Sequence, residues 1–151
     1  MKSSFLLLFI VVLFPMSLTA QRGLEGVWEG HITIGGIYSD QKLPMQLYIT
    51  LNGRKIEGRT YVQLPEGETI QMHLTGRLYF DNSMELWEEH FVGDEDNAYL
   101  PKFNRQYQIM WKRDLWNAEL RGYWQEVTEN TFDKFRQRGR IKLKKQKSRG
   151  V

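Results

Sequence analysis

From Gly26 to Leu143, apolar and polar side chains alternate along one short stretch after another. Residues two apart lie on the same face of a strand, so this period predicts strands with one buried and one solvated face. No long stretch with the 3.6-residue period of a helix follows residue 20. The pattern therefore predicts an all-β domain whose antiparallel sheet closes on itself or packs against another.

Turn residues divide the chain into eight expected strands. Asn52-Gly53 is a strong signal for a two-residue hairpin, and Gly35-Gly36 and Pro65-Glu66-Gly67 end the first and third strands. The expected strands span residues 26–34, 44–51, 54–63, 68–80, 84–92, 103–111, 115–126 and 135–144. A small barrel of eight strands holds side chains or one small ligand. We therefore expect an eight-stranded antiparallel up-and-down barrel.

The start of the chain has the pattern of a secretory signal peptide. An unbroken apolar run, Phe5–Phe14, is followed by small residues at Thr19-Ala20, and the run is too short to cross a bilayer as a helix. No other stretch is apolar enough to be a transmembrane segment. We expect an exported protein, periplasmic or secreted and bacterial, with a signal peptide at 1–20, a barrel domain at 21–144 and a basic tail at 145–151.

The chain has no cysteine, so packing and sheet closure must stabilise it without disulfides. Nine of its 21 Lys and Arg lie between Lys134 and Arg149, with no acid among them. This basic end predicts attraction to an anionic surface, whereas the alternative is a solvated strand whose cations meet Glu29 and Glu119. Nucleic acid is not the expected partner, because an exported chain seldom meets it.

Two turns set the expected register of the second half. A three-residue turn at Asp81-Asn82-Ser83 pairs Phe80 with Met84 and turns Glu88 and His90 inward. A tight turn at Arg113-Asp114 would pair Trp111 with Trp116, Phe103 with Trp124, and Arg105 with Gly122. In that register the missing side chain of Gly122 leaves space for the guanidinium of Arg105.

Polar side chains on an apolar inner wall predict a ligand, because buried charges are costly unless they are paired. Arg105 and Tyr107, two apart on one face, are expected to hold a carboxylate while aromatic and apolar side chains surround an apolar body. The candidate ligand-binding residues are Arg105, Tyr107, Glu88, His90, Trp124, Trp116, Phe103 and Met72. The alternative is an internal salt bridge between Arg105 and Glu88 in a filled barrel, which would act as an envelope interaction module through its outer face and basic tail.

Gly26-Val27-Trp28 at the start of the first strand resembles the calycin superfamily, which includes the lipocalins and fatty-acid-binding proteins. In those families the tryptophan faces the base of the barrel and an arginine from near the last strand packs across it. The resemblance implies a lipocalin-like barrel that binds a small apolar or amphipathic molecule, with Gly26 and Trp28 as the structural motif. It implies that Arg138 or Arg140 supplies the arginine.

Catalytic and metal-binding motifs are absent from the sequence. There is no Cys, no Gly-x-Ser-x-Gly, no phosphate loop and no His-Glu-x-x-His. The acidic stretch Gly93–Asn97 lacks the spacing of a calcium loop, and His31, His73 and His90 lie on three separate expected strands. We therefore expect a binding protein rather than an enzyme, without a metal or another cofactor.

Overall fold

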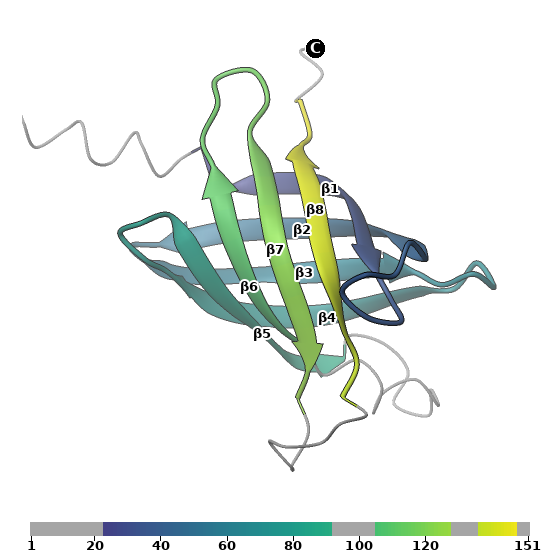
Figure 1. The fold of residues 1–151 in the computed structure, drawn as a ribbon. Coiled ribbons are helices and arrows are strands. Elements are labelled where there is room, and N and C mark those ends of the chain that lie inside the picture. The colour runs from purple at the N-terminus through teal and green to yellow at the C-terminus, as the bar shows by residue number, and fades with distance from the viewer. Residues whose placement is uncertain (1–22, 92–104, 128–135, 148–151) are drawn as a thin grey trace, which may run out of the picture.

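The computed structural model describes residues 23–91, 105–127 and 136–147, which form a closed antiparallel barrel (Figure 1). Its eight strands are β1 (Gly26–Thr33), β2 (Lys42–Asn52), β3 (Lys55–Gln63), β4 (Thr69–Leu78), β5 (Ser83–Phe91), β6 (Arg105–Lys112), β7 (Glu119–Glu126) and β8 (Arg138–Lys145). Each strand pairs with its neighbours in chain order, and β1 pairs with β8 to close the sheet. The prediction of an eight-stranded up-and-down barrel is confirmed.

Alternation places the core inside the barrel. In β3, and in β2 as far as Ile49, every second residue is buried, and the inward rows of all eight strands contribute to one hydrophobic cluster. Trp28 is fully buried in it, and its indole Nε1 donates a hydrogen bond to the carbonyl oxygen of Leu24 at 2.8 Å. Leu24, which precedes β1, is also fully buried. Figure 1 shows β6, β7 and β8 crossing steeply in front of β1 to β4.

The turn between β4 and β5 is longer than predicted, which corrects the register. Residues 79–82 form the connection, with Asn82 at a φ of 64° and the Tyr79 amide donating to the Ser83 carbonyl at 2.8 Å. Leu78 therefore pairs with Met84, and Phe80 leaves the sheet and is 89% exposed. The register shifts by two residues, an even number, so Glu88 still faces inward.

A β-bulge interrupts the same strand pair further along. Leu74 pairs with Glu88, whereas its neighbour His73 pairs with His90, so Glu89 is the extra residue of β5. The backbone register at His90 therefore differs from the predicted one, in which Glu88 and His90 follow one unbroken alternation. The His90 side chain lies outside the described part of the structure.

The hairpin between β6 and β7 also corrects a prediction. Its loop is residues 113–118 rather than a two-residue turn, so Trp111 pairs with Leu120 and Arg105 with Glu126. Gly122 lies opposite Ile109, and a Cβ there would be 2.0 Å from the Gln108 carbonyl oxygen. Its missing side chain therefore allows the two backbones to approach closely and leaves no space for Arg105.

Among the described residues, no helix has the length and apolar character needed to cross a bilayer.

Candidate functional site

A polar cluster inside the barrel is built around Glu88 of β5. The Glu88 side chain is buried, and its Oε1 accepts hydrogen bonds from the Tyr107 hydroxyl at 2.5 Å and the Thr60 hydroxyl at 3.0 Å. Its Oε2 accepts a hydrogen bond from the backbone N–H of Arg105 at 3.2 Å. Strands β3, β5 and β6 thus each contribute to the environment of one buried carboxylate.

Arg105 and Trp124 extend this cluster toward β7. The Arg105 guanidinium carbon lies 4.7 Å from the centre of the Trp124 ring, a cation–π distance. The Trp124 Nε1 donates to the carbonyl oxygen of Thr33 at 2.9 Å. Both side chains are buried, and Met72, buried on β4, lies opposite Thr60 in the register. We call Glu88, Arg105, Tyr107, Thr60 and Trp124 the interior cluster.

Burial dominates the protonation chemistry of this cluster. Desolvation raises the pKa of Glu88, although the charge of Arg105 and the hydrogen bonds from Tyr107 and Thr60 act in the opposite direction. Desolvation and the nearby Glu88 charge raise the pKa of Tyr107 well above its usual value. Tyr107 therefore remains a protonated donor at physiological pH.

The structure brings together only part of the predicted ligand-binding set. Glu88, Arg105, Tyr107, Trp124 and Met72 are all buried on the inner wall. The expected inward position of Trp116 is wrong, because Trp116 lies in the β6–β7 loop and its side chain is 78% exposed. Phe103 and the His90 side chain lie outside the described residues.

Thr60 is the one polar member of the interior cluster that was not predicted as a site residue. It lies in the inward row of β3, whose other buried members include Ile56 and Val62. The sequence does contain a sign of this role, because a hydroxyl in an otherwise apolar inward row usually has a buried hydrogen-bond partner.

The cation over Trp28 corrects another expectation. The Lys145 Nζ lies 4.8 Å from the centre of the Trp28 ring and also donates to the Glu25 carbonyl oxygen. Lys145 pairs with Trp28 in the β1–β8 register, whereas Arg138 and Arg140 lie nearer the other end of β8 and are exposed. The residue on Trp28 is therefore a lysine rather than either arginine, and burial lowers its pKa.

Gly26 keeps the place that the motif gives it at the start of β1. Its φ is +107°, in the region that favours glycine, and a Cβ there would lie 3.3 Å from the Lys145 Nζ. The glycine therefore allows the ammonium of Lys145 to lie close to the start of β1.

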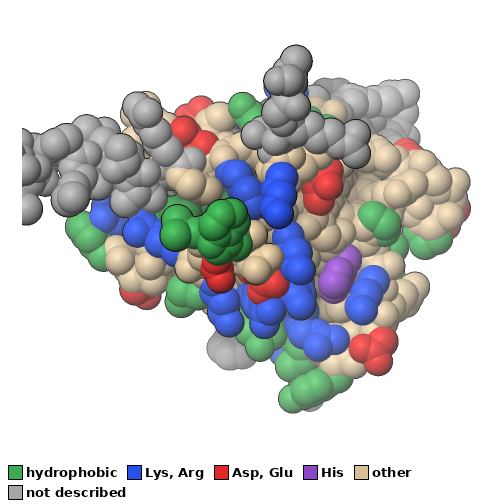
Figure 2. All heavy atoms as spheres, turned by 90° about the horizontal axis from the view of Figure 1, so that it is seen from above, with side chains coloured by type: hydrophobic (Ala, Val, Ile, Leu, Met, Phe, Trp, Pro, Cys, Tyr) green, Lys and Arg blue, Asp and Glu red, His purple; other side chains and the backbone are tan. Residues whose placement is uncertain are grey.

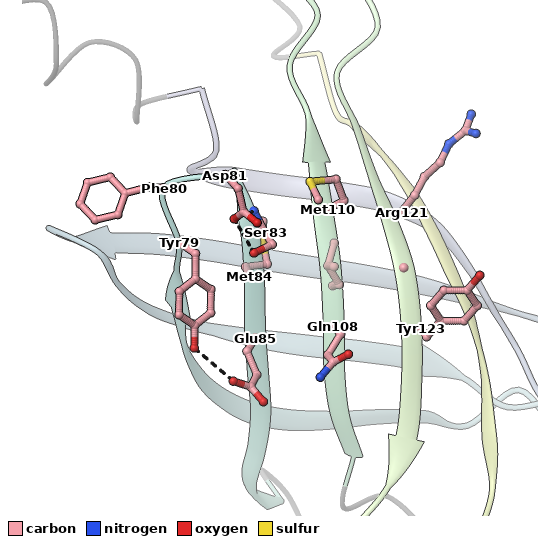
Figure 3. A pocket seen from close by; sticks show the side chains of 12 residues that line it. Tyr79, Phe80, Asp81, Ser83, Met84, Glu85, Gln108, Met110, Arg121 and Tyr123 are labelled. Carbon is pink, nitrogen blue, oxygen red and sulfur yellow. Dashed lines mark hydrogen bonds between the residues drawn. The ribbon is translucent and has the colours of Figure 1, made fainter.

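The outer face carries an apolar groove across β5, β6 and β7, with a volume of about 770 Å³ (Figure 3). Tyr79, Phe80, Met110 and Tyr123 line it, all of them more than 40% exposed. Tyr79 donates a hydrogen bond to the carboxylate of Glu85 at 3.2 Å, which fixes one wall. These exposed aromatic and sulfur-containing side chains give the groove a surface suited to a hydrocarbon.

A second outer groove, of about 530 Å³, lies across β7, β8 and β1. We call it the basic groove. Its charged and titratable lining consists of His31, Asp40, Lys42, Lys112, Arg121, Arg140 and Lys142. It shares Arg121, Gly122 and Tyr123 with the apolar groove, so the two grooves are contiguous.

The two acids expected to neutralise the cations of β8 interact with other side chains instead. Glu29 and Glu119 lie on the two strands beside β8, as predicted, and both are opposite Lys144 in the register. However, Glu29 accepts a hydrogen bond from the Gln46 side chain at 2.8 Å, and Glu119 pairs with Arg121 at 2.5 Å. Within the described residues, Lys142 and Lys144 form no ion pair.

His31 responds to the charges of the basic groove. Burial lowers its pKa most, and the nearby charges of Lys42, Lys142 and Arg140 lower it further. These repulsive interactions indicate a positive potential at the imidazole.

Known proteins provide no assignment for this site. No protein family, no curated protein and no solved structure matches the chain. The fold defines the class as a closed eight-stranded antiparallel β-barrel, an architecture consistent with a calycin-like fold. Within the described ranges, no three His, Asp or Glu side chains form a potential metal site, and the Gly93–Asn97 stretch lies outside those ranges.

Proposed function

We propose that this chain is an exported, non-enzymatic binding protein that holds a small amphipathic anion on the outer face of β5 to β8. The observation that carries the proposal is the junction of the apolar groove with the basic groove at Arg121, Gly122 and Tyr123. Export is inferred from the apolar run and the small residues that precede Gln21. The non-enzymatic role is inferred from the missing catalytic motifs.

The chemistry of the two grooves suits the two parts of such a ligand. The volume of the apolar groove, about 770 Å³, falls in the range usual for small-molecule sites. A hydrocarbon tail would lie against Met110 and Tyr123, and the carboxylate or phosphate head would lie near Arg121 and Lys142. Lys142, which has no acidic partner among the described residues, favours such a head group, because the anion reduces its repulsion from the neighbouring cations.

The barrel interior is the second candidate site, favoured by the stacking of Arg105 on Trp124. A ligand carboxylate was expected to accept hydrogen bonds from Arg105 and Tyr107. Glu88 already accepts one from the Tyr107 hydroxyl and one from the Arg105 backbone. Because the protein supplies its own carboxylate there, the outer face is the better supported position for a ligand.

Calorimetric titration with dodecanoate, dodecanol and acetate tests the proposal. Dodecanoate should bind roughly tenfold more tightly than dodecanol, because only the anion gains from the cations, and acetate should bind weakly because it buries no tail. Tyr123→Ser should weaken dodecanoate binding. Lys142→Gln should weaken it by roughly twofold to fivefold, the scale of one exposed charge pair.

Matched variants separate the two candidate positions. Lys55→Gln removes an outer-face cation that pairs with Glu57 on β3, away from both grooves, and should leave binding unchanged. If Arg105→Gln abolishes binding while Tyr123→Ser and Lys142→Gln retain it, the ligand lies inside the barrel and the outer-face proposal is wrong. Equal binding of dodecanoate and dodecanol would also contradict it.

A further inference from the structure

The tip of the β6–β7 hairpin is an exposed apolar knob. Leu115 is 96% exposed and its neighbour Trp116 is 78% exposed. Figure 1 shows this hairpin projecting beyond the body of the barrel. Large apolar side chains side by side in water are unfavourable unless another phase or partner covers them.

The loop holds this knob in a defined conformation. The Asp114 Oδ1 accepts hydrogen bonds from the backbone N–H groups of Trp116 at 2.8 Å and Asn117 at 3.3 Å. This use of an Asp side chain is an Asx-type turn. The only acid within the loop is therefore directed toward the backbone, and Leu115 and Trp116 project from an ordered turn.

Cations surround the knob on two sides. Lys112 and Arg113 precede it along the hairpin, and a hollow of about 880 Å³ beside it is lined by Arg113, Lys144, Lys145 and Lys147. Arg113 lies over the Trp111 ring at 4.5 Å, and Lys145 is held at Trp28. Lys112, Lys144 and Lys147 are exposed and form no ion pair among the described residues. Figure 2, which looks down on this end, shows a hydrophobic group with several Lys and Arg side chains around it and acidic side chains directly beside it.

We propose that this tip docks the barrel on an anionic phospholipid membrane, with Leu115 and Trp116 inserted at the interface and Lys112, Lys144 and Lys147 against the head groups. Tryptophan favours the boundary between head groups and acyl chains, and lysine stems extend along apolar surface while the ammonium stays in water. A protruding knob suits insertion into a soft phase. The cationic border selects an anionic surface over a neutral one.

The membrane proposal can be tested separately from the proposed ligand function, because Leu115, Trp116, Lys144 and Lys147 line neither ligand groove. The tip lies at the end of the barrel where β1 begins, and the connection of residues 34–41 lies at the opposite end. Tyr38 in that connection is 91% exposed, so it is a matched aromatic control. Arg138, exposed at the start of β8, is the matched cation control.

The test measures binding to vesicles of phosphatidylcholine with and without phosphatidylglycerol. All variants are made in the full chain, so any contribution of the apolar run Phe5–Phe14 is common to each. The double variant Leu115→Ser/Trp116→Ser should lose roughly tenfold or more in affinity for the anionic vesicles. Lys144→Gln and Lys147→Gln should each lose roughly fivefold, and rising salt should weaken wild-type binding. Tyr38→Ser and Arg138→Gln should bind like the wild type.

A depth measurement makes the outcome specific to the tip. Brominated lipids should quench the emission of the wild type more strongly than that of Trp116→Phe, and mainly in anionic vesicles. Wild-type quenching equal to that of Trp116→Phe would overturn the proposal, as would equal losses in the tip and control variants. If the double variant instead converts a dimer to a monomer in sedimentation without changing vesicle binding, the tip contacts a second copy and the membrane proposal is wrong.

Discussion

The interior cluster and the basic groove both contain charged side chains, but they differ in whether protein groups bind those charges. Inside, the Glu88 carboxylate receives hydrogen bonds from Tyr107, Thr60 and the Arg105 backbone. In the basic groove, Lys142 has no acidic partner among the described residues, although Arg121 pairs with Glu119 and Arg140 lies 3.7 Å from Asp40.

The difference follows from solvation. A buried carboxylate without donors would be strongly destabilising, so the interior must satisfy its own polar groups. Water solvates exposed ammonium groups, so an outer face tolerates like charges that repel one another. The three hydrogen bonds that Glu88 receives therefore indicate a structural role for this carboxylate, and an exposed lysine without an acidic partner indicates a capacity to bind an anion.

The largest expected effect is the loss of stability when a buried ring of the interior cluster is removed. Trp124→Ala removes a buried ring, its hydrogen bond to Thr33 and the support for Arg105, so the free energy of unfolding should fall by about 3–5 kcal/mol. Trp87→Ala, at a ring that is 37% exposed on the outer face, should cost under about 1 kcal/mol. Urea denaturation measures both, and similar losses would remove the distinction between the two faces.

An intermediate effect concerns the protonation of Glu88. Tyr107→Phe removes a donor to the carboxylate, so stability near pH 7 should fall by about 1.5–3 kcal/mol. Because burial raises the folded-state pKa of Glu88, the folded protein binds more protons than the unfolded chain, and stability declines as pH rises through that pKa. Tyr107→Phe raises this pKa further, so its cost should be smaller near pH 4 than at pH 7.

Urea unfolding between pH 4 and pH 8 measures this dependence. Tyr48→Phe, at an exposed ring on β2, is the control and should show little loss at any pH. A Tyr107→Phe loss that is the same at every pH would show that its hydroxyl does not interact with a titrating carboxylate.

The smallest effect on stability belongs to the basic groove. Lys142→Gln removes one of the charges that lower the pKa of His31, so this pKa should rise toward its ordinary 6.5. The free energy of unfolding should change by less than about 0.5 kcal/mol, because the side chain is exposed. NMR titration of the imidazole measures the pKa, and bound dodecanoate should raise it in the wild type for the same reason.

The sign of the pH effect at His31 is opposite to that at Glu88. Its lowered pKa means that the folded state binds fewer protons, so its contribution is present above pH 6.5 and is lost as pH falls through the folded-state pKa. Lys55→Gln should leave the His31 titration unchanged. An unchanged His31 pKa in Lys142→Gln would argue against a shared positive field.

Much of the interior cluster was predictable from the sequence. Alternation, together with the expected turns, predicts that Glu88, Arg105, Tyr107 and Trp124 face inward, and the structure buries all four. The partners were not predictable in the same way. Arg105 lies opposite Glu126 rather than Gly122, because the β6–β7 loop is four residues longer than the turn at Arg113-Asp114.

Side-chain hydrogen bonds explain why these two turns differ in length from the predicted ones. Asp81 accepts from the Ser83 backbone at 3.0 Å, and Asp114 accepts from the Trp116 backbone at 2.8 Å. Asp stabilises turns of several lengths through such bonds, so its presence predicts a turn but not the number of residues in it. The β-bulge opposite His73 and the position of Lys145 over Trp28 also depend on strand register, so alternation does not predict them.

The sequence by itself determined the number of strands, their order and the face of most side chains, because a period of two is a local property of each strand. Only the tertiary structure decided which inward side chains touch and which outer ones form grooves. Shifting a strand by two or four residues keeps every side chain on its face but gives it a new neighbour, so cross-strand contacts are not encoded in the alternation. The meeting of the apolar and basic grooves at Tyr123 is such a contact, fixed by the pairing of β6, β7 and β8.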